Sequence, residues 1–171
     1  NIPIQKASDF DAAKLLYNNG LFGILISALA SNIMMFSFSS EATQTYQFIW
    51  WVSINSILLL RLLDFVEWKL RSSRKVSSGL LGIQRYATGC IVTAIAWSFY
   101  VFLFYTQLNN TELFLKFIII AMLAGGSASL LAANRFTAIS YSMILLVPIS
   151  LMGLQAEQEH RQFLGLLGLV Y

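Results

Sequence analysis

The chain has 171 residues, of which 57% are hydrophobic and only 11% are charged, and its formal net charge is +3. Soluble domains carry about 25% charged residues. A soluble domain of this length also has too little interior to bury so large an apolar fraction. The composition therefore excludes an ordinary soluble protein and predicts a chain that lies in a lipid bilayer.

Residues 1–20 are predicted to form a cytoplasmic amphipathic lead-in. Ser8 is suited to cap a short helix, and Asp9 and Asp11 stand in its first turn, where the helix dipole favours acidic side chains. The polar run at 18–20 is expected to end this helix before the first membrane crossing begins.

Five long apolar runs follow the lead-in. A run of about 18 to 20 residues matches a hydrocarbon layer roughly 30 Å thick, because a helix rises about 1.5 Å per residue. The runs are continuous and lack the alternation of membrane β-strands. The predicted fold class is therefore an all-α membrane helix bundle that forms one domain over 1–171. The predicted helices are 21–38, 48–66, 86–105, 113–133 and 136–154, with the start of a truncated sixth at 163–171.

Lysine and arginine are divided unevenly between the two ends of these helices. Eight lie at the end that carries the amino terminus and two at the opposite end, while Arg61 falls inside a helix. The predicted loop 67–85 holds five of the eight. Because cytoplasmic loops carry such an excess, the amino terminus is predicted to be cytoplasmic.

Charged residues near the inner end of the second predicted helix are the main candidates for a signal-transmitting ion cluster. Arg61, Asp64 and Glu67 are spaced three apart, so Arg61 and Asp64 can pair on one helix face. Arg135, at the inner end of the fourth predicted helix, reaches the same level. Two interpretations stay open: an ion cluster that anchors the helices at the interface, and a two-state element that transmits helix movement to the cytoplasm. A proton relay is disfavoured, because no further acidic residue lies at mid-depth.

Polar residues inside the predicted helices indicate either hydrogen bonds between helices or a small pocket that opens outward. The candidate pocket residues are Asn32, Trp51, Asn55, Thr93, Trp97, Ser98 and Tyr100.

Small residues recur at every fourth position of the fourth predicted helix, and such residues let helices approach closely in lipid. This stripe is interpreted as a packing face within the chain, with a homodimer face as the alternative. Pro148 is expected to kink the fifth helix. The stripe consists of Ala121, Gly125, Ser129 and Ala133.

No catalytic or nucleotide-binding motif marks an enzyme within this chain. Cys90 is the single cysteine and falls in a predicted helix, so an internal disulfide and a cysteine metal site are excluded. We expect no metal, no cofactor and no catalytic residue in 1–171. The local basic excess indicates a cytoplasmic loop rather than a nucleic-acid-binding surface.

Two stretches carry a resemblance to a known class of module. They are A-A-K-L-L-Y-N-N (12–19), and F-I-I-I-A-M-L-A-G-G-S-A-S-L-L-A-A-N-R-F-T-A-I-S-Y-S-M-I-L-L-V-P-I-S-L (117–151) with its Gly/Ala/Ser run, its Arg135 turn and its late Pro148. This pattern resembles the N-terminal multi-helix input (sensor) module of bacterial GGDEF diguanylate cyclases and sensor histidine kinases. The resemblance implies a bacterial inner membrane and a cytoplasmic output domain after the sixth helix.

The leading hypothesis is thus a transmembrane signal-input module that regulates an appended output domain, with a diguanylate cyclase favoured over a histidine kinase. Its expected partners are the lipid bilayer, a second copy of the chain, the output domain in the same chain, and a small-molecule or lipid ligand. A small transporter or channel unit is the alternative, which requires a discontinuous helix or a mid-membrane charge. A scaffolding subunit of a membrane complex is the third possibility.

Overall fold

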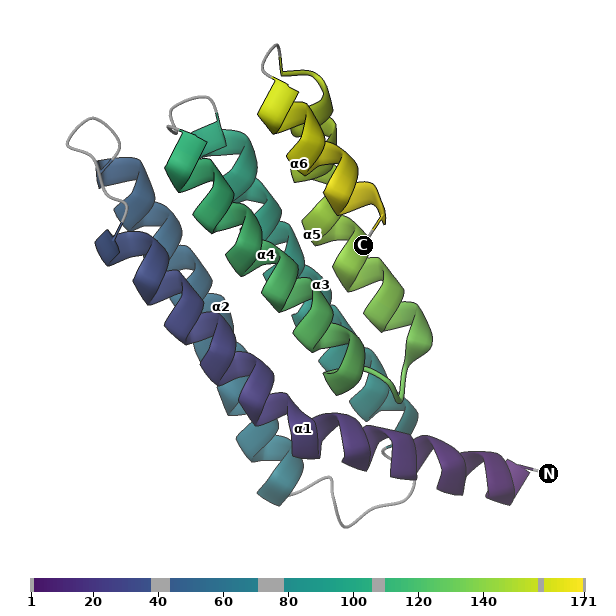
Figure 1. Cartoon of the computed structure of the whole chain (residues 1–171). Helices are drawn as coiled ribbons and strands as arrows, with labels where there is room; N and C mark the ends of the chain where they lie inside the picture. The colour runs from purple at the N-terminus through teal and green to yellow at the C-terminus, as the bar shows by residue number, and fades with distance from the viewer. Residues whose placement is uncertain (1, 38–43, 71–78, 106–109, 157–158, 171) are drawn as a thin grey trace.

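The computed structural model describes residues 2–37, 44–70, 79–105, 110–156 and 159–170. Almost all of these residues are helical, apart from the connections at 131–134 and 155–156, and these ranges contain no strand (Figure 1). The six helices follow the predicted order, which confirms the all-α class. They are α1 (Ile2–Ser37), α2 (Gln44–Leu70), α3 (Gly79–Phe104), α4 (Asn110–Leu130), α5 (Arg135–Leu154) and α6 (Glu159–Val170).

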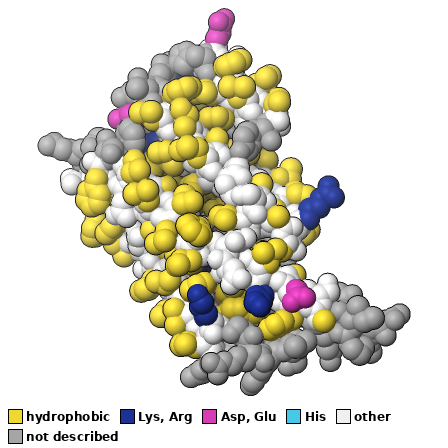
Figure 2. Space-filling view, turned by 60° about the horizontal axis from the view of Figure 1, so that its bottom comes forward, with side chains coloured by type: hydrophobic (Ala, Val, Ile, Leu, Met, Phe, Trp, Pro, Cys, Tyr) yellow, Lys and Arg dark blue, Asp and Glu magenta, His cyan; other side chains and the backbone are white. Residues whose placement is uncertain are grey.

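Five of these helices are long and apolar enough to cross a membrane, and α6 is a shorter apolar helix. Large hydrophobic side chains on them are exposed, among them Phe22, Leu60, Phe99 and Phe136. Figure 2 shows hydrophobic side chains spread over the described surface in view, with few charged ones among them. Soluble monomers rarely expose apolar patches above a few hundred Å². The chain is therefore a multi-pass membrane protein.

The first helix does not end where the sequence indicated. The predicted stop at 18–20 is wrong, because α1 runs without interruption from Ile2 to Ser37. Leu16, Tyr17 and Gly20 are buried, so packing against the bundle outweighs the low helix propensity of the asparagines and the glycine. Part-way along, α1 bends, and its first section lies across one end of the bundle (Figure 1).

The helices are longer than predicted, and the long basic loop is correspondingly shorter. Helix α2 continues to Leu70 and α3 begins at Gly79, so Lys69 and Arg85 are helical residues rather than loop residues. Charged side chains at helix ends can extend toward the membrane surface or form ion pairs. The remaining basic residues of the predicted loop, in 71–78, lie outside the described residues.

The small-residue stripe on α4 is only partly a packing face. Helix α4 ends at Leu130, so Ala133 lies in the following turn, and Ser129 is exposed. The small residues that are buried stand elsewhere on the helix, at Ala124 and Ser127. Of the predicted stripe, Ala121 and Ala133 pack against the core, and Gly125 lines a cavity of about 510 Å³ between α4, α5 and the end of α6.

Helices α5 and α6 are in backbone contact. A Cβ atom added to Gly165 would lie 2.6 Å from the carbonyl oxygen of Ser150 and 2.7 Å from the amide nitrogen of Leu154. Gly153 faces the same contact from α5, since a Cβ atom there would lie 2.9 Å from Cα of Gly165. Two glycines therefore set the close approach of α6 to α5, as small residues do in other membrane helix pairs.

Candidate functional site

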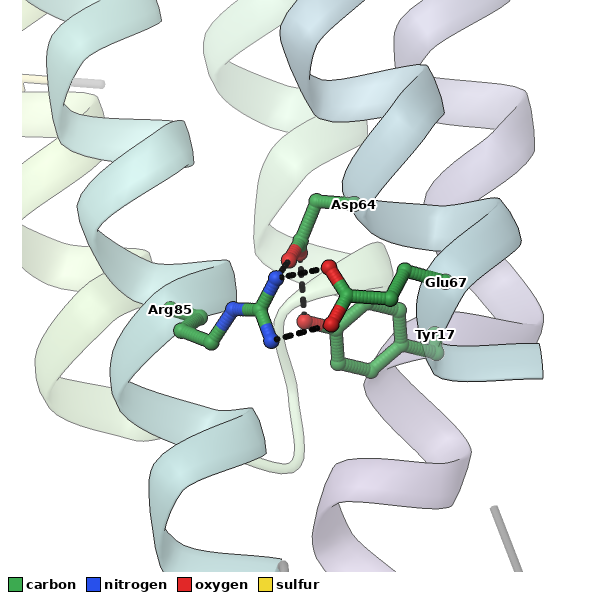
Figure 3. Close-up of polar contacts among 4 residues, drawn as sticks. All are labelled: Tyr17, Asp64, Glu67 and Arg85. Carbon is green, nitrogen blue, oxygen red and sulfur yellow. Dashed lines mark hydrogen bonds and ion pairs between the residues drawn. The ribbon is translucent and has the colours of Figure 1, made fainter. Parts of the chain in front are cut away.

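An ion cluster joins α1, α2 and α3 (Figure 3). Arg85 of α3 places Nη2 2.5 Å from Oδ1 of Asp64 and 2.7 Å from Oε2 of Glu67. Its Nη1 donates to Oε1 of Glu67 at 3.4 Å. The hydroxyl of Tyr17, on α1, donates to Oδ2 of Asp64 at 2.5 Å. One carboxylate thus receives a partner from each of two neighbouring helices.

The spacing of the residues explains the shape of this cluster. Asp64 and Glu67 are three residues apart, so both project from one side of α2 near its end. The side chain of Asp64 is 22% exposed and that of Glu67 is 45% exposed. Asp64 is therefore the more buried of the two carboxylates, and solvent screens its ion pair with Arg85 less than it screens the pair of Glu67.

Tyr17 is fixed by aromatic neighbours as well as by Asp64. Its ring stacks on Trp68 with 4.6 Å between the ring centroids, and it meets the edge of Tyr86 at 5.2 Å. The ring of Phe10 lies 6.2 Å from that of Trp68. These contacts bind the first section of α1 to the ends of α2 and α3.

Arg61 stands apart from the carboxylates, which corrects the predicted ion cluster. Its Nη1 donates to Oγ1 of Thr93 at 3.1 Å and its Nη2 donates to the sulfur of Cys90 at 3.1 Å. The guanidinium lies 5.7 Å from the ring centroid of Tyr86. The predicted pair of Arg61 with Asp64 is therefore wrong, because Thr93 and Cys90 on α3 take the guanidinium instead.

Arg135 is also outside the cluster. It is exposed at the first position of α5, and the ion pairs of the cluster join Arg85, not Arg135, to Asp64 and Glu67. The sequence reasoning missed Arg85 because it counted this residue as part of a loop. The signal that could have found it is periodicity, since Arg85 and Gly89 are one helical turn apart on the α3 face toward α2.

A cavity of about 220 Å³ adjoins the cluster between α1, α2 and α3. Tyr17, Gly20 and Ile24 of α1 line it and are buried. Leu60 of α2 and Val92 of α3 line it as well, and both are exposed. The cavity therefore has its floor on α1 and opens sideways between α2 and α3.

Charged groups line the same cavity. Arg61 and Asp64 contribute from α2, and Arg85 contributes from α3. Cations and a carboxylate between membrane helices are costly in hydrocarbon and mark functional sites by default. This cavity and its ion cluster are our candidate functional site.

The seven predicted pocket residues do not form one site. Asn32, Trp51 and Asn55 meet between α1 and α2: the indole nitrogen of Trp51 donates to Oδ1 of Asn32 at 3.3 Å. Asn55 Nδ2 donates to Oγ of Ser31 at 3.4 Å. Thr93 is a partner of Arg61 instead. These residues act as links between helices, which was the other interpretation of the same pattern.

Ser98 forms a hydrogen bond between α3 and α5, close to Pro148. Its hydroxyl donates to the carbonyl oxygen of Ile144 on α5. That carbonyl stands four residues before Pro148, which has no N–H and cannot complete the helical hydrogen bond. Helix α5 continues through Pro148 to Leu154. A hydroxyl from α3 thus satisfies a backbone group that lipid cannot.

Trp97 and Tyr100 belong to a buried aromatic cluster at the opposite end of α3. The ring of Trp50 lies 5.2 Å from that of Trp97 and 4.4 Å from that of Tyr100, while Phe104 lies 4.8 Å from Tyr100. Lys116 of α4 is 2% exposed here, with Nζ 5.1 Å from the ring centroid of Tyr100. Lys116 stands near the start of the predicted helix 113–133, and no pattern in the sequence indicated that its side chain is buried.

No family model, curated protein or solved structure matches this chain. The fold and the site therefore define its class on their own. It is a multi-pass α-helical membrane protein with an ion cluster and a cavity between three of its helices.

Proposed function

We propose that this chain is the signal-input module of a bacterial inner-membrane protein and that it regulates a cytoplasmic output domain in the same protein. The amino terminus is cytoplasmic in this proposal. The output is a diguanylate cyclase, or otherwise a histidine kinase, as the resemblance to such input modules suggests. The full protein acts as a homodimer.

The observation that carries the proposal is the link of three helices through Asp64 beside an open cavity. Arg85 and Tyr17 hold Asp64 from α3 and α1. If α3 shifts along α2, Arg85 leaves Asp64, and Arg61 is then the nearest cation on the same helix, three residues away. The two ion pairings, Asp64 with Arg85 and Asp64 with Arg61, would define two states of these helices. A ligand shifts the balance between the two states only when it binds one of them more tightly than the other.

Substitution of Arg85 in the full-length protein tests this function. We expect Arg85→Gln to change the signal response severalfold, because the pairing that favours one state is lost. The measurement is cyclic-di-GMP synthesis or autophosphorylation in membranes. Arg135→Gln is the matched control, since Arg135 is an exposed arginine outside the cluster, and its response should equal that of the wild type. An unchanged response in a folded Arg85→Gln protein contradicts the proposal.

The coding sequence beyond position 171 is a second test. A G-G-[DE]-E-F motif or a histidine-kinase H-box is expected there. A continuation without any signalling domain removes the proposal.

Burial of Lys116 favours a second candidate, a small transporter. A buried cation within a membrane span is the kind of feature that the sequence alone did not show, and intramembrane cations mark substrate and ion paths. Ion or solute flux into liposomes that contain the protein, with Lys116→Met as the variant, separates the two functions. Flux that depends on Lys116 establishes the transporter, and its absence leaves the input module.

A further inference from the structure

We propose that the cavity between α2 and α3 binds the phosphate head group of an anionic membrane lipid, and that Arg61 is its main partner. The role of this lipid as a signal rests on the proposed function. The binding itself requires no output domain and is measured without one.

The charges around the cavity leave Arg61 as the group that an anion would stabilise. Both carboxylates of the cluster are occupied, since Arg85 holds Asp64 and Glu67. The partners of Arg61 are a hydroxyl, a thiol and an aromatic ring, and none of them carries a negative charge. In the described ranges no carboxylate lies within 4 Å of its guanidinium.

A guanidinium with no carboxylate in contact with it is costly at membrane depth. An anion that enters the cavity removes this cost. Arginine suits phosphate in particular, because its planar guanidinium donates two parallel hydrogen bonds to phosphate oxygens.

The shape of the cavity indicates a head group with acyl chains outside it. Its volume of about 220 Å³ is below the roughly 300–1,000 Å³ of sites that enclose whole small molecules. The exposed Leu60 and Val92 stand on its two sides and present apolar surface to the bilayer. Acyl chains along these side chains would leave the phosphate beside Arg61.

The position of the cavity agrees with a lipid of the inner leaflet. The cavity lies toward the end of the bundle where α2 ends and α3 begins, which is the predicted cytoplasmic end. Anionic lipids give this leaflet its negative surface potential, and basic pockets between membrane helices on this side bind their head groups.

Gly89 leaves space on α3 for the side chain of Arg61. A Cβ atom added at Gly89 would lie 3.1 Å from Cγ and 3.4 Å from Cδ of Arg61. The aliphatic part of the Arg61 side chain therefore packs on α3 at Gly89, where α3 has no side chain. This contact holds the guanidinium at the wall of the cavity.

The test is native mass spectrometry of the purified chain, equilibrated with equal amounts of phosphatidylglycerol and phosphatidylcholine. The wild type should retain phosphatidylglycerol preferentially. Arg61→Gln should lower this preference at least about tenfold, because the charge-assisted hydrogen bonds from the guanidinium to the phosphate are lost. Arg135→Gln should keep the preference, since it removes an exposed arginine at the same end of the bundle.

A second variant tests the cavity without removing its charge. Val92→Trp places a large ring at an exposed rim position and should also lower lipid retention, with a melting temperature close to that of the wild type. Equal retention by Arg61→Gln and the wild type overturns the inference, as does an equal loss in Arg135→Gln. Full displacement of the lipid by inorganic phosphate also overturns it, because the ligand is then a soluble anion.

The outcome separates this inference from the proposed function. If the wild type prefers the anionic lipid but Arg61→Gln does not change the activity of the output domain, the lipid site stands and the lipid is not the signal. If Arg85→Gln changes the activity of the output domain but the wild type shows no lipid preference, the proposed signal-input function stands and the proposed lipid site is wrong.

Discussion

Asp64 is the residue on which the contacts of α1, α2 and α3 converge. Its two carboxylate oxygens are divided between Arg85 and Tyr17, so each neighbouring helix has its own oxygen. A carboxylate in a membrane span is costly when it loses its partners. The three groups therefore act as a unit whose parts cannot be replaced independently.

A double-mutant cycle measures this dependence. Arg85→Gln should destabilise the bundle by about 1–3 kcal/mol, because it leaves an acceptor without its charged donor. Asp64→Asn added to Arg85→Gln should cost less than the sum of the two single changes, since the uncompensated charge is gone. Unfolding in lipid–detergent micelles gives the three free energies. Strict additivity would show that the pair contributes nothing of its own.

The contact between Ser98 and the Ile144 carbonyl makes a second prediction. Ser98→Ala should cost about 1–3 kcal/mol, because the carbonyl loses its donor in a place that water does not reach. Pro148→Ala should offset much of this loss, since alanine restores the N–H that completes the helix. Ser56→Ala is the control, as the Ser56 hydroxyl is exposed and donates to Val52 within its own helix. Failure of Pro148→Ala to rescue Ser98→Ala contradicts the assignment.

The sequence predicted the residue types of the site better than their pairing. Asp64 and Glu67 were identified from their spacing on one helix. Their partner Arg85 lies on another helix, and no pattern within α2 determines which cation of α3 faces it. Arg61 was assigned to Asp64 by proximity in sequence, yet Thr93 and Cys90 compete for it from α3. Pairing across helices depends on their relative rotation, which short-range patterns do not encode.

At the scale of the elements, the contact between α5 and α6 depends on the absence of a side chain. Gly165→Leu should separate the two helices, because the added Cβ would meet backbone atoms of α5 rather than movable side chains. We expect faster backbone hydrogen exchange in α6. Gly126→Ala is the matched control, since a Cβ there meets nothing within 4 Å and alanine is the better helix former by up to about 1 kcal/mol. Unchanged exchange in Gly165→Leu contradicts this packing.

The order of the helices could be predicted from hydropathy, and their ends could not. Apolar runs locate the part of a helix in hydrocarbon. Helices continue beyond it, as α2 does through Glu67, Trp68 and Lys69. The continuation of α1 through Asn18 and Asn19 depends on burial of Tyr17 and Gly20, which is a property of the assembled bundle.

At the scale of the whole molecule, the described helices present an apolar surface with charged groups near its ends. The predicted cytoplasmic amino terminus is tested by labelling single cysteines with an impermeant maleimide in spheroplasts. Gln155→Cys, at the exposed end of α5, should react in intact spheroplasts. Ser8→Cys should react only after lysis. The native Cys90 is 2% exposed and should stay unlabelled. The reverse pattern would place the amino terminus outside and contradict the charge-based orientation.

The bond between Ser98 and α5 also bears on how the chain is built. A newly synthesised α5 enters the bilayer with one backbone carbonyl that its own turn cannot satisfy. Its donor stands on α3, which the ribosome completes earlier, so the acceptor finds its partner already in place when it arrives. A circularly permuted chain in which α5 is translated before α3 would have to hold that carbonyl open in lipid, and we expect it to accumulate poorly.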